Sequence, residues 1–133
     1  MVDEEAESPF VIEQRPTRRY PWRGGVEHNG GTVFSLYPDE GMMTSSLSEL
    51  VESVLVSGPY RYGEWFDLPM PLYLVHDDET GDTFRVAIRD GRVEFHVLPD
   101  TKSSGLCGLY QRLVDASGST WTVERRIESP QPT

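Results

Sequence analysis

Apolar residues recur along this chain at two different spacings, and each spacing predicts a different kind of element. Ser46 and Glu49 match a capping box, in which each side chain bonds the other residue's amide. Gly58 suits a left-handed C-cap, and Pro59 ends the helix. The apolar residues between these signals repeat at i, i+3, i+4, i+7 and i+8, as on one helix face: Leu47, Leu50, Val51, Val54 and Leu55.

A second helix is predicted from Ser103 or Ser104 to Gly118. Its apolar positions have the same spacing and again form one stripe. They are Leu106, Leu109, Tyr110, Leu113 and Val114.

Alternating apolar and polar residues predict strands elsewhere. The Asp90-Gly91 pair is a two-residue hairpin signal, which places Arg89 opposite Arg92 and Val86 opposite Phe95. The predicted strands span residues 32–37, 72–76, 83–89, 92–97 and 120–128.

The predicted order is β-α-β-β-β-α-β, with or without an extra N-terminal edge strand at residues 10–12. One-sided helices and an alternating, mainly antiparallel sheet indicate an α+β two-layer sandwich with two helices on one face. Residues 9–128 are expected to form a single domain. Residues 1–8 are expected to be a disordered acidic tail, and residues 129–133 a frayed C-terminus.

Acidic residues outnumber basic ones, 22 to 12, which gives a formal net charge of −10. All but Lys102 of the basic residues are arginines, which indicates adaptation to a salt-rich cytoplasm, where ions screen the repulsion between carboxylates. A GC-rich genome is the alternative source of the arginines. The acid excess argues against nucleic-acid partners. There is no apolar run of membrane-spanning length, so no membrane association is expected, and the single cysteine fits a cytoplasmic location.

The segment 59–71 combines aromatic residues with a cation, a composition typical of interaction hot spots. It is expected to be a long loop that binds a partner, or else one that folds back over the core. The predicted binding residues are Tyr60, Arg61, Tyr62, Trp65 and Phe66.

Two further groups of arginines are candidate binding residues. The one local basic patch consists of Arg15, Arg18, Arg19 and Arg23, interleaved with Tyr20 and Trp22. Its candidate binding residues are Arg18, Arg19 and Trp22, and the expected alternative is that the acidic tail neutralises the patch within the chain. Arg89 and Arg92 lie opposite each other on the predicted sheet face away from the helices. Like charges in that position repel unless a carboxylate such as Glu94, or an external anion, lies between them.

No catalytic motif is recognisable. Cys107 near a helix start is a conceivable nucleophile, but no known cysteine-enzyme pattern surrounds it. His76 and His96 lack a third spaced ligand, so no metal site and no cofactor are expected.

The sequence therefore predicts a small non-enzymatic protein-binding, accessory or regulatory domain, whose partner is another protein or a second copy. The alternative is an acidic inhibitor or immunity-type protein that covers a basic active site, which electrostatic attraction would help it to reach.

Overall fold

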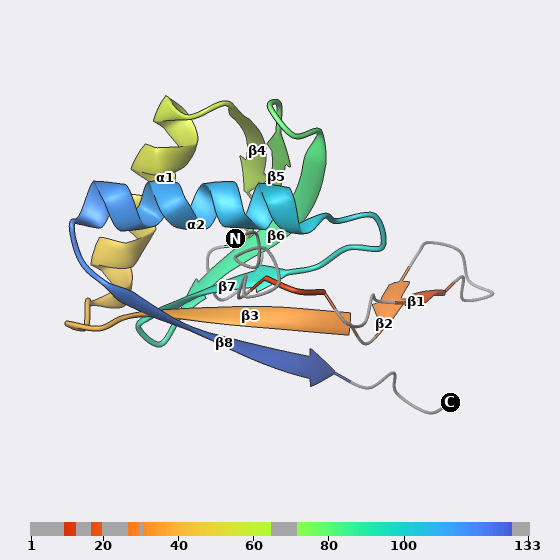
Figure 1. Cartoon of the computed structure of the whole chain (residues 1–133), viewed down its shortest axis with the longest axis horizontal. Coiled ribbons are helices and arrows are strands. Elements are labelled where there is room, and N and C mark those ends of the chain that lie inside the picture. Colours follow the sequence, from red (N-terminus) through yellow and green to blue (C-terminus); the bar gives the residue numbers. More distant parts are fainter. Residues whose placement is uncertain (1–9, 13–16, 20–26, 30, 65–71, 129–133) are drawn as a thin grey trace, which may run out of the picture.

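The computed structural model of this chain describes residues 10–12, 17–19, 27–29, 31–64 and 72–128. These residues form a six-stranded antiparallel sheet with two helices, α1 and α2, and a separate two-stranded hairpin (Figure 1). The elements are β1 Thr17–Arg19, β2 Glu27–Asn29, β3 Gly31–Pro38, α1 Thr44–Ser57, β4 Tyr60–Glu64, β5 Leu72–Asp77, β6 Asp82–Arg89, β7 Arg92–His96, α2 Ser103–Ser117 and β8 Trp121–Glu128.

The strand order in the large sheet is β4-β5-β6-β7-β3-β8, so β4 and β8 are its two edges. Both helices pack on the same face of the sheet. This arrangement confirms the predicted α+β two-layer sandwich. The first eight residues and residues 129–133, expected to be tails, lie outside the described residues.

The β6–β7 hairpin has the predicted register, with Val86 opposite Phe95 and Arg89 opposite Arg92. Its turn residues Asp90 and Gly91 have φ values of 51° and 75°, as a two-residue turn of this kind requires. The apolar side of the hairpin is fully buried beneath the helices. The opposite side carries the charged residues, as the alternation predicts.

The sheet and helices enclose one apolar cluster. Leu47, Val51 and Leu55 contribute from α1, and Leu106, Leu109 and Leu113 from α2, all fully buried. Since all six are predicted stripe positions, the helical pattern alone identified the buried faces.

The segment 10–12 is not the edge strand that the sequence suggested. Phe10 is instead a core residue, fully buried, whose ring lies 5.1 Å from that of Phe34 and 5.3 Å from that of Tyr110. Its carbonyl accepts a hydrogen bond from the Ser103 hydroxyl. Burial of this one ring therefore ties the segment to both layers.

The predicted N-terminal capping box of α1 is wrong, and its C-cap is the predicted Gly58 in a different conformation. The helix begins at Thr44, and Met43 is its N-cap without a side-chain cap bond in the described structure, so Ser46 and Glu49 form no capping box. Gly58 follows the helix with extended backbone, φ −94°, instead of the left-handed conformation. Tertiary contact explains the early start, because the Thr44 hydroxyl accepts the amide of Gly91 at 3.0 Å.

The N-terminus of α2 is capped from a distant strand. The buried Asp82 carboxylate accepts the amides of Lys102 at 2.7 Å and Gly105 at 3.2 Å. Burial raises the pKa of Asp82, which these amide bonds oppose. A side chain at position 105 would collide with Asp82, so the glycine permits this close approach. At the other end the helix stops at Gly118, as predicted, and this glycine has a left-handed conformation, φ 69°.

Candidate functional site

A groove of about 410 Å³ lies between α1 and the edge strand β4. The sequence pattern places residues 60–64 in a loop, whereas in the structure they form β4, paired antiparallel with β5. Strand alternation turns Tyr60 and Tyr62 toward the helices. The residues that line the groove are Glu49, Glu52, Ser53, Val56 and Tyr62.

The groove has apolar walls and an acidic rim. Val56 is 68% exposed and Tyr62 is 37% exposed, which is unusual for apolar side chains of this size next to a core. Tyr62 is held in place by an edge-to-face contact with Tyr73, with ring centroids 5.9 Å apart. Glu49 and Glu52 are three positions apart and therefore share one face of α1.

The backbone of β4 is available for pairing beside this groove. The amide of Asp78 donates to the carbonyl of Pro59 at 2.8 Å, which turns the backbone groups of residue 59 toward β5. Along a strand these groups alternate in direction, so those of Tyr60 and Tyr62 point away from β5. In the described part of the chain, β4 pairs with β5 alone.

The five binding residues predicted from the aromatic segment have different environments. Tyr60 is buried, 9% exposed, and burial raises its pKa. Arg61 lies on the other face of β4 and binds Asp78 through Nε and Nη2, at 3.1 and 2.9 Å. Of the three that the structure describes, only Tyr62 lines the groove. Trp65 and Phe66 lie outside the described residues.

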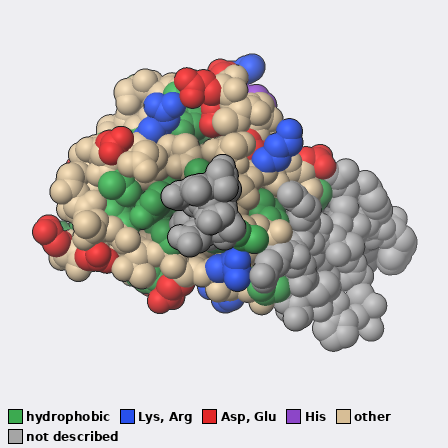
Figure 2. All heavy atoms as spheres, in the orientation of Figure 1, with side chains coloured by type: hydrophobic (Ala, Val, Ile, Leu, Met, Phe, Trp, Pro, Cys, Tyr) green, Lys and Arg blue, Asp and Glu red, His purple; other side chains and the backbone are tan. Residues whose placement is uncertain are grey.

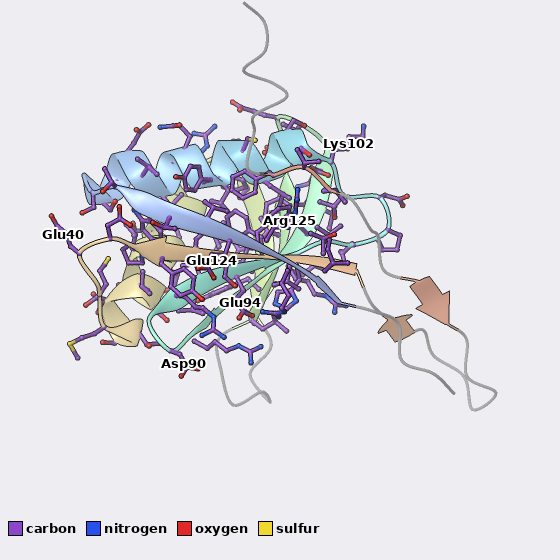
Figure 3. All side chains as sticks on the ribbon, turned by 60° about the horizontal axis from the view of Figure 1, so that its bottom comes forward. Glu40, Asp90, Glu94, Lys102, Glu124 and Arg125 are labelled. Carbon is purple, nitrogen blue, oxygen red and sulfur yellow. The ribbon has the colours of Figure 1, made fainter. Side chains whose placement is uncertain are left out.

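The sheet face opposite the helices carries a cluster of charges around Glu94 (labelled in Figure 3). This carboxylate is only 1% exposed. It accepts hydrogen bonds from His96 Nε2 at 3.0 Å and Arg92 Nε at 2.9 Å, and Arg89 Nη2 lies 3.4 Å away. The His96 bond, more than those of the arginines, lowers the pKa of Glu94 to about 2, against the opposing effect of burial.

Glu94 therefore lies where Arg89 and Arg92 would otherwise repel each other. Both guanidinium groups are engaged with this carboxylate, and Arg92 also lies 3.7 Å from Asp90. The sequence left two ways to balance these arginines, a carboxylate of the same chain or an external anion. In the structure they pair with the carboxylate of Glu94. A role of these arginines in binding a partner stays a prediction.

The remaining predicted arginines give less information. Arg18 and Arg19 belong to β1, which pairs with β2. Trp22 lies outside the described residues. The basic patch therefore also stays a prediction.

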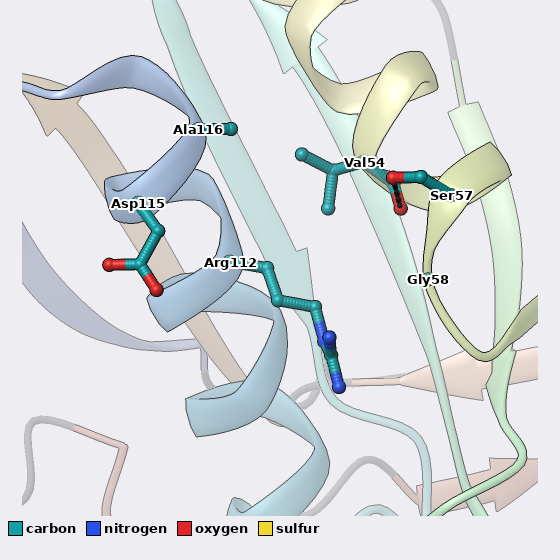
Figure 4. A pocket seen from close by; sticks show the side chains of 6 residues that line it. All are labelled: Val54, Ser57, Gly58, Arg112, Asp115 and Ala116. Atoms are coloured by element: carbon teal, nitrogen blue, oxygen red, sulfur yellow. Dashed lines mark hydrogen bonds between the residues drawn. The ribbon is translucent and has the colours of Figure 1, made fainter.

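A second cavity, of about 350 Å³, separates the C-terminal halves of α1 and α2 (Figure 4). Val54, Ser57 and Gly58 line one side of it. Arg112, Asp115 and Ala116 line the other. Arg112 crosses between the helices, with its guanidinium carbon 5.7 Å from the centre of the Tyr60 ring and Nη2 3.1 Å from Glu79. Because this cation bridges an aromatic ring and a carboxylate, it joins α2 to the β4 and β5 edge of the sheet.

In the described part of the chain, Cys107 lies on the other side of the sheet from His76 and His96. Cys107 packs from α2 against the core, on the helix side of the sheet. His76 and His96 point to the opposite side, where His76 Nδ1 bonds the Thr83 hydroxyl at 2.9 Å. Among the described residues there is no group of three or more His, Cys, Asp or Glu residues placed to hold a metal ion.

Acidic side chains are spread around the molecule on the face shown in Figure 2. None of the helices in the described ranges is long and apolar enough to cross a membrane. Comparison with protein-family models, with curated proteins and with solved structures found no match to this chain.

Proposed function

We propose that this chain is a protein-binding domain that takes an extended, basic segment of a partner protein along β4. The observation that carries the proposal is the position of an acid-rimmed groove directly beside β4, a strand that among the described residues pairs only with β5. Addition of a strand to such an edge supplies backbone hydrogen bonds, while pockets beside the edge select alternate side chains.

The backbone groups of Tyr60 and Tyr62 would pair with the incoming segment. Every second side chain of that segment would then lie on the helix side of the sheet, against Tyr62 and Val56. The exposed apolar surface of these two residues favours an aliphatic or aromatic side chain at this position.

The charges favour cations elsewhere in the segment. Glu49 and Glu52 line the groove. The nearest cation described on β4, Arg61, is neutralised by Asp78 on the other face of the sheet. An acidic segment would meet two carboxylates together with the net charge of −10.

The alternative function, an inhibitor that covers a basic active site, would use the same groove carboxylates against a folded surface. We rank it second. An inhibitor of this kind is expected to gather its acids on one rigid face, and the acids on the visible face of Figure 2 are scattered.

The proposal is tested with a fluorescein-labelled ten-residue peptide, titrated with the protein at about 0.1 M salt. Every second residue of the peptide is threonine, and the positions between alternate lysine and valine, so that cations and apolar side chains both lie on the helix side of the sheet. We expect binding by fluorescence anisotropy, with NMR shift changes confined to residues 49–56 and 60–62. The same peptide with glutamate in place of lysine, and the same peptide interrupted by proline, should bind at least tenfold more weakly.

The matched protein variants separate the groove from general charge. Glu49→Gln with Glu52→Gln should weaken binding about fivefold, the order expected for two exposed ion pairs. Glu40→Gln with Asp100→Asn removes the same charge at exposed sites away from the groove and should have little effect. Equal weakening by both pairs, or shift changes centred elsewhere, would reject the proposal.

A further inference from the structure

The second edge of the sheet, β8, has a different and self-complementary pattern. Within the described residues this strand pairs only with β3. The carbonyl of Thr120 accepts the amide of Asp39 at 2.9 Å, which turns the backbone of residue 120 toward β3. By alternation, the outward-facing backbone groups of β8 are those of Trp121, Val123, Arg125 and Ile127.

The side chains of β8 divide between the two faces of the sheet. Val123, Arg125 and Ile127 share the helix face with Trp121, which is part of the core. Glu124 and Arg126 are exposed on the opposite face. Ile127 is 38% exposed, although it lies at a strand edge that no proline interrupts.

We infer that two copies of this chain pair through β8, antiparallel, about a twofold axis at Arg125. In this register Glu124 of each copy lies opposite Arg126 of the other, and Val123 lies opposite Ile127. Two ion pairs then form on one face and two apolar pairs on the other. The outward backbone groups of Val123, Arg125 and Ile127 become hydrogen-bonded across the axis.

Neighbouring registers lack this complementarity. Side chains must stay on their own face, so the register changes in steps of two residues. A step in one direction places the Glu124 side chains of the two copies opposite each other. A step in the other direction does the same for the two Arg126 side chains. Each of these arrangements sets like charges directly across the interface.

The central pair, Arg125 opposite Arg125, is the one unfavourable contact. This side chain has a partner within its own chain, since Arg125 Nη1 donates a hydrogen bond to the carbonyl of Val11 at 3.3 Å. Each guanidinium group thus bonds the Val11 carbonyl of its own chain. Glu124 and Arg125 are marked in Figure 3.

The positions of the helices leave room for the second copy. The helices pack over the β4–β7 side of the sheet, and β8 extends past them (Figure 1). The pair would share one continuous sheet, with both β4 edges at its far ends. The inference is independent of the proposed function, since it uses neither β4 nor the groove.

Analytical ultracentrifugation over a concentration series at about 0.1 M salt tests the inference. We expect the wild type to dimerise reversibly, and Glu124→Arg and Arg126→Glu each to shift the dissociation constant at least tenfold toward monomer. A general electrostatic effect predicts the reverse for Glu124→Arg, because this substitution makes the chain less negative. Glu40→Arg changes the charge equally at an exposed site outside β8 and should leave the dimer intact.

Two combinations make the test specific for the register. Mixing the Glu124→Arg chain with the Arg126→Glu chain should give a heterodimer, because each arginine then faces a glutamate. The double variant, Glu124→Arg with Arg126→Glu, should recover the homodimer. A wild type that stays monomeric to millimolar concentration, or two single variants that fail to associate when mixed, would overturn the inference.

Discussion

His96 Nε2 lies 3.0 Å from the carboxylate of Glu94, on the sheet face opposite the helices. An ionised carboxylate can only accept, so Nε2 carries the proton in this bond. The two residues are next-but-one neighbours on β7 and therefore point to the same side. Glu94 is thus a buried, ionised acid outside the apolar core, and its carboxylate is bonded to a histidine and an arginine.

Replacing Glu94 by Gln should lower the free energy of unfolding by about 3 kcal/mol at neutral pH. The variant leaves Arg92 and Arg89 without the carboxylate that balances them, and removal of one partner from a buried charged group is strongly destabilising. Urea unfolding followed by circular dichroism measures the change. Glu40→Gln, at an exposed position, should change it by less than about 0.5 kcal/mol. Equal stability of the two variants would contradict the prediction.

The same residue predicts a dependence on pH. The pKa of Glu94 is about 2 in the folded chain, whereas the ordinary value for a glutamate side chain is 4.5, so folding favours the ionised form. Its stabilisation is therefore complete above about pH 4.5 and is lost as the pH falls toward 2. The difference in stability between wild type and Glu94→Gln should shrink by about 3 kcal/mol across this window. A difference that stays constant from pH 6 to pH 2.5 would show that the pKa is not lowered.

The two arginines around Glu94 should differ in importance. Arg92 donates a hydrogen bond of 2.9 Å from Nε, whereas Arg89 lies at 3.4 Å and is more exposed. We therefore expect Arg92→Ser to destabilise the fold by about 2 kcal/mol and Arg89→Ser by about 1 kcal/mol. Thermal unfolding of both variants checks this order, and a larger loss from Arg89→Ser would reverse the assignment.

Two glycines of α2 should respond in opposite directions to alanine. Alanine favours a helix interior over glycine by about 1 kcal/mol, so Gly108→Ala should stabilise, because the nearest atom that a Cβ would meet is Asp77 Oδ2 at 4.0 Å. At Gly105 a Cβ would collide with Asp82, and we expect a net loss of about 1–3 kcal/mol. Chemical unfolding of the two single variants measures both signs. Stabilisation by Gly105→Ala would mean that Asp82 does not approach the helix so closely.

Salt should stabilise this protein if its acid excess is an adaptation. A net charge of −10 produces self-repulsion, which added ions screen. We expect the melting temperature to rise by several degrees between about 0.05 and 2 M KCl. Sodium perchlorate, which weakens the hydrophobic effect while screening charge equally, serves as the comparison. A melting temperature that is flat or falls in KCl would contradict the salt-adaptation hypothesis.

The hydrophobic pattern was sufficient wherever local geometry determines the outcome. Both helices, the β6–β7 register and the faces that Val86 and Phe95 occupy follow from residue spacing, since a one-residue shift would expose every apolar side chain. The Asp90-Gly91 turn belongs to the same class. Its backbone conformation is favoured by those two residues alone.

The candidate site depended on contacts between distant segments. Tyr60 and Tyr62 lie among prolines and glycines and so resembled a loop, yet pairing with β5 makes them a strand. Thr44 starts α1 because its hydroxyl meets Gly91 far along the chain, a bond that outweighed the local capping signal. The groove exists only because α1 ends beside this new edge.

The sequence by itself determined the α+β class, the two helix faces and the hairpin register, because these depend on periodicities of a few residues. Only the tertiary structure decided that Glu94 would be buried between two arginines, that Phe10 would enter the core, and that β4 and β8 would be the sheet edges. These features depend on the order of the strands in the sheet. Strand order brings together residues that are far apart along the chain, so no short stretch of sequence predicts their contacts.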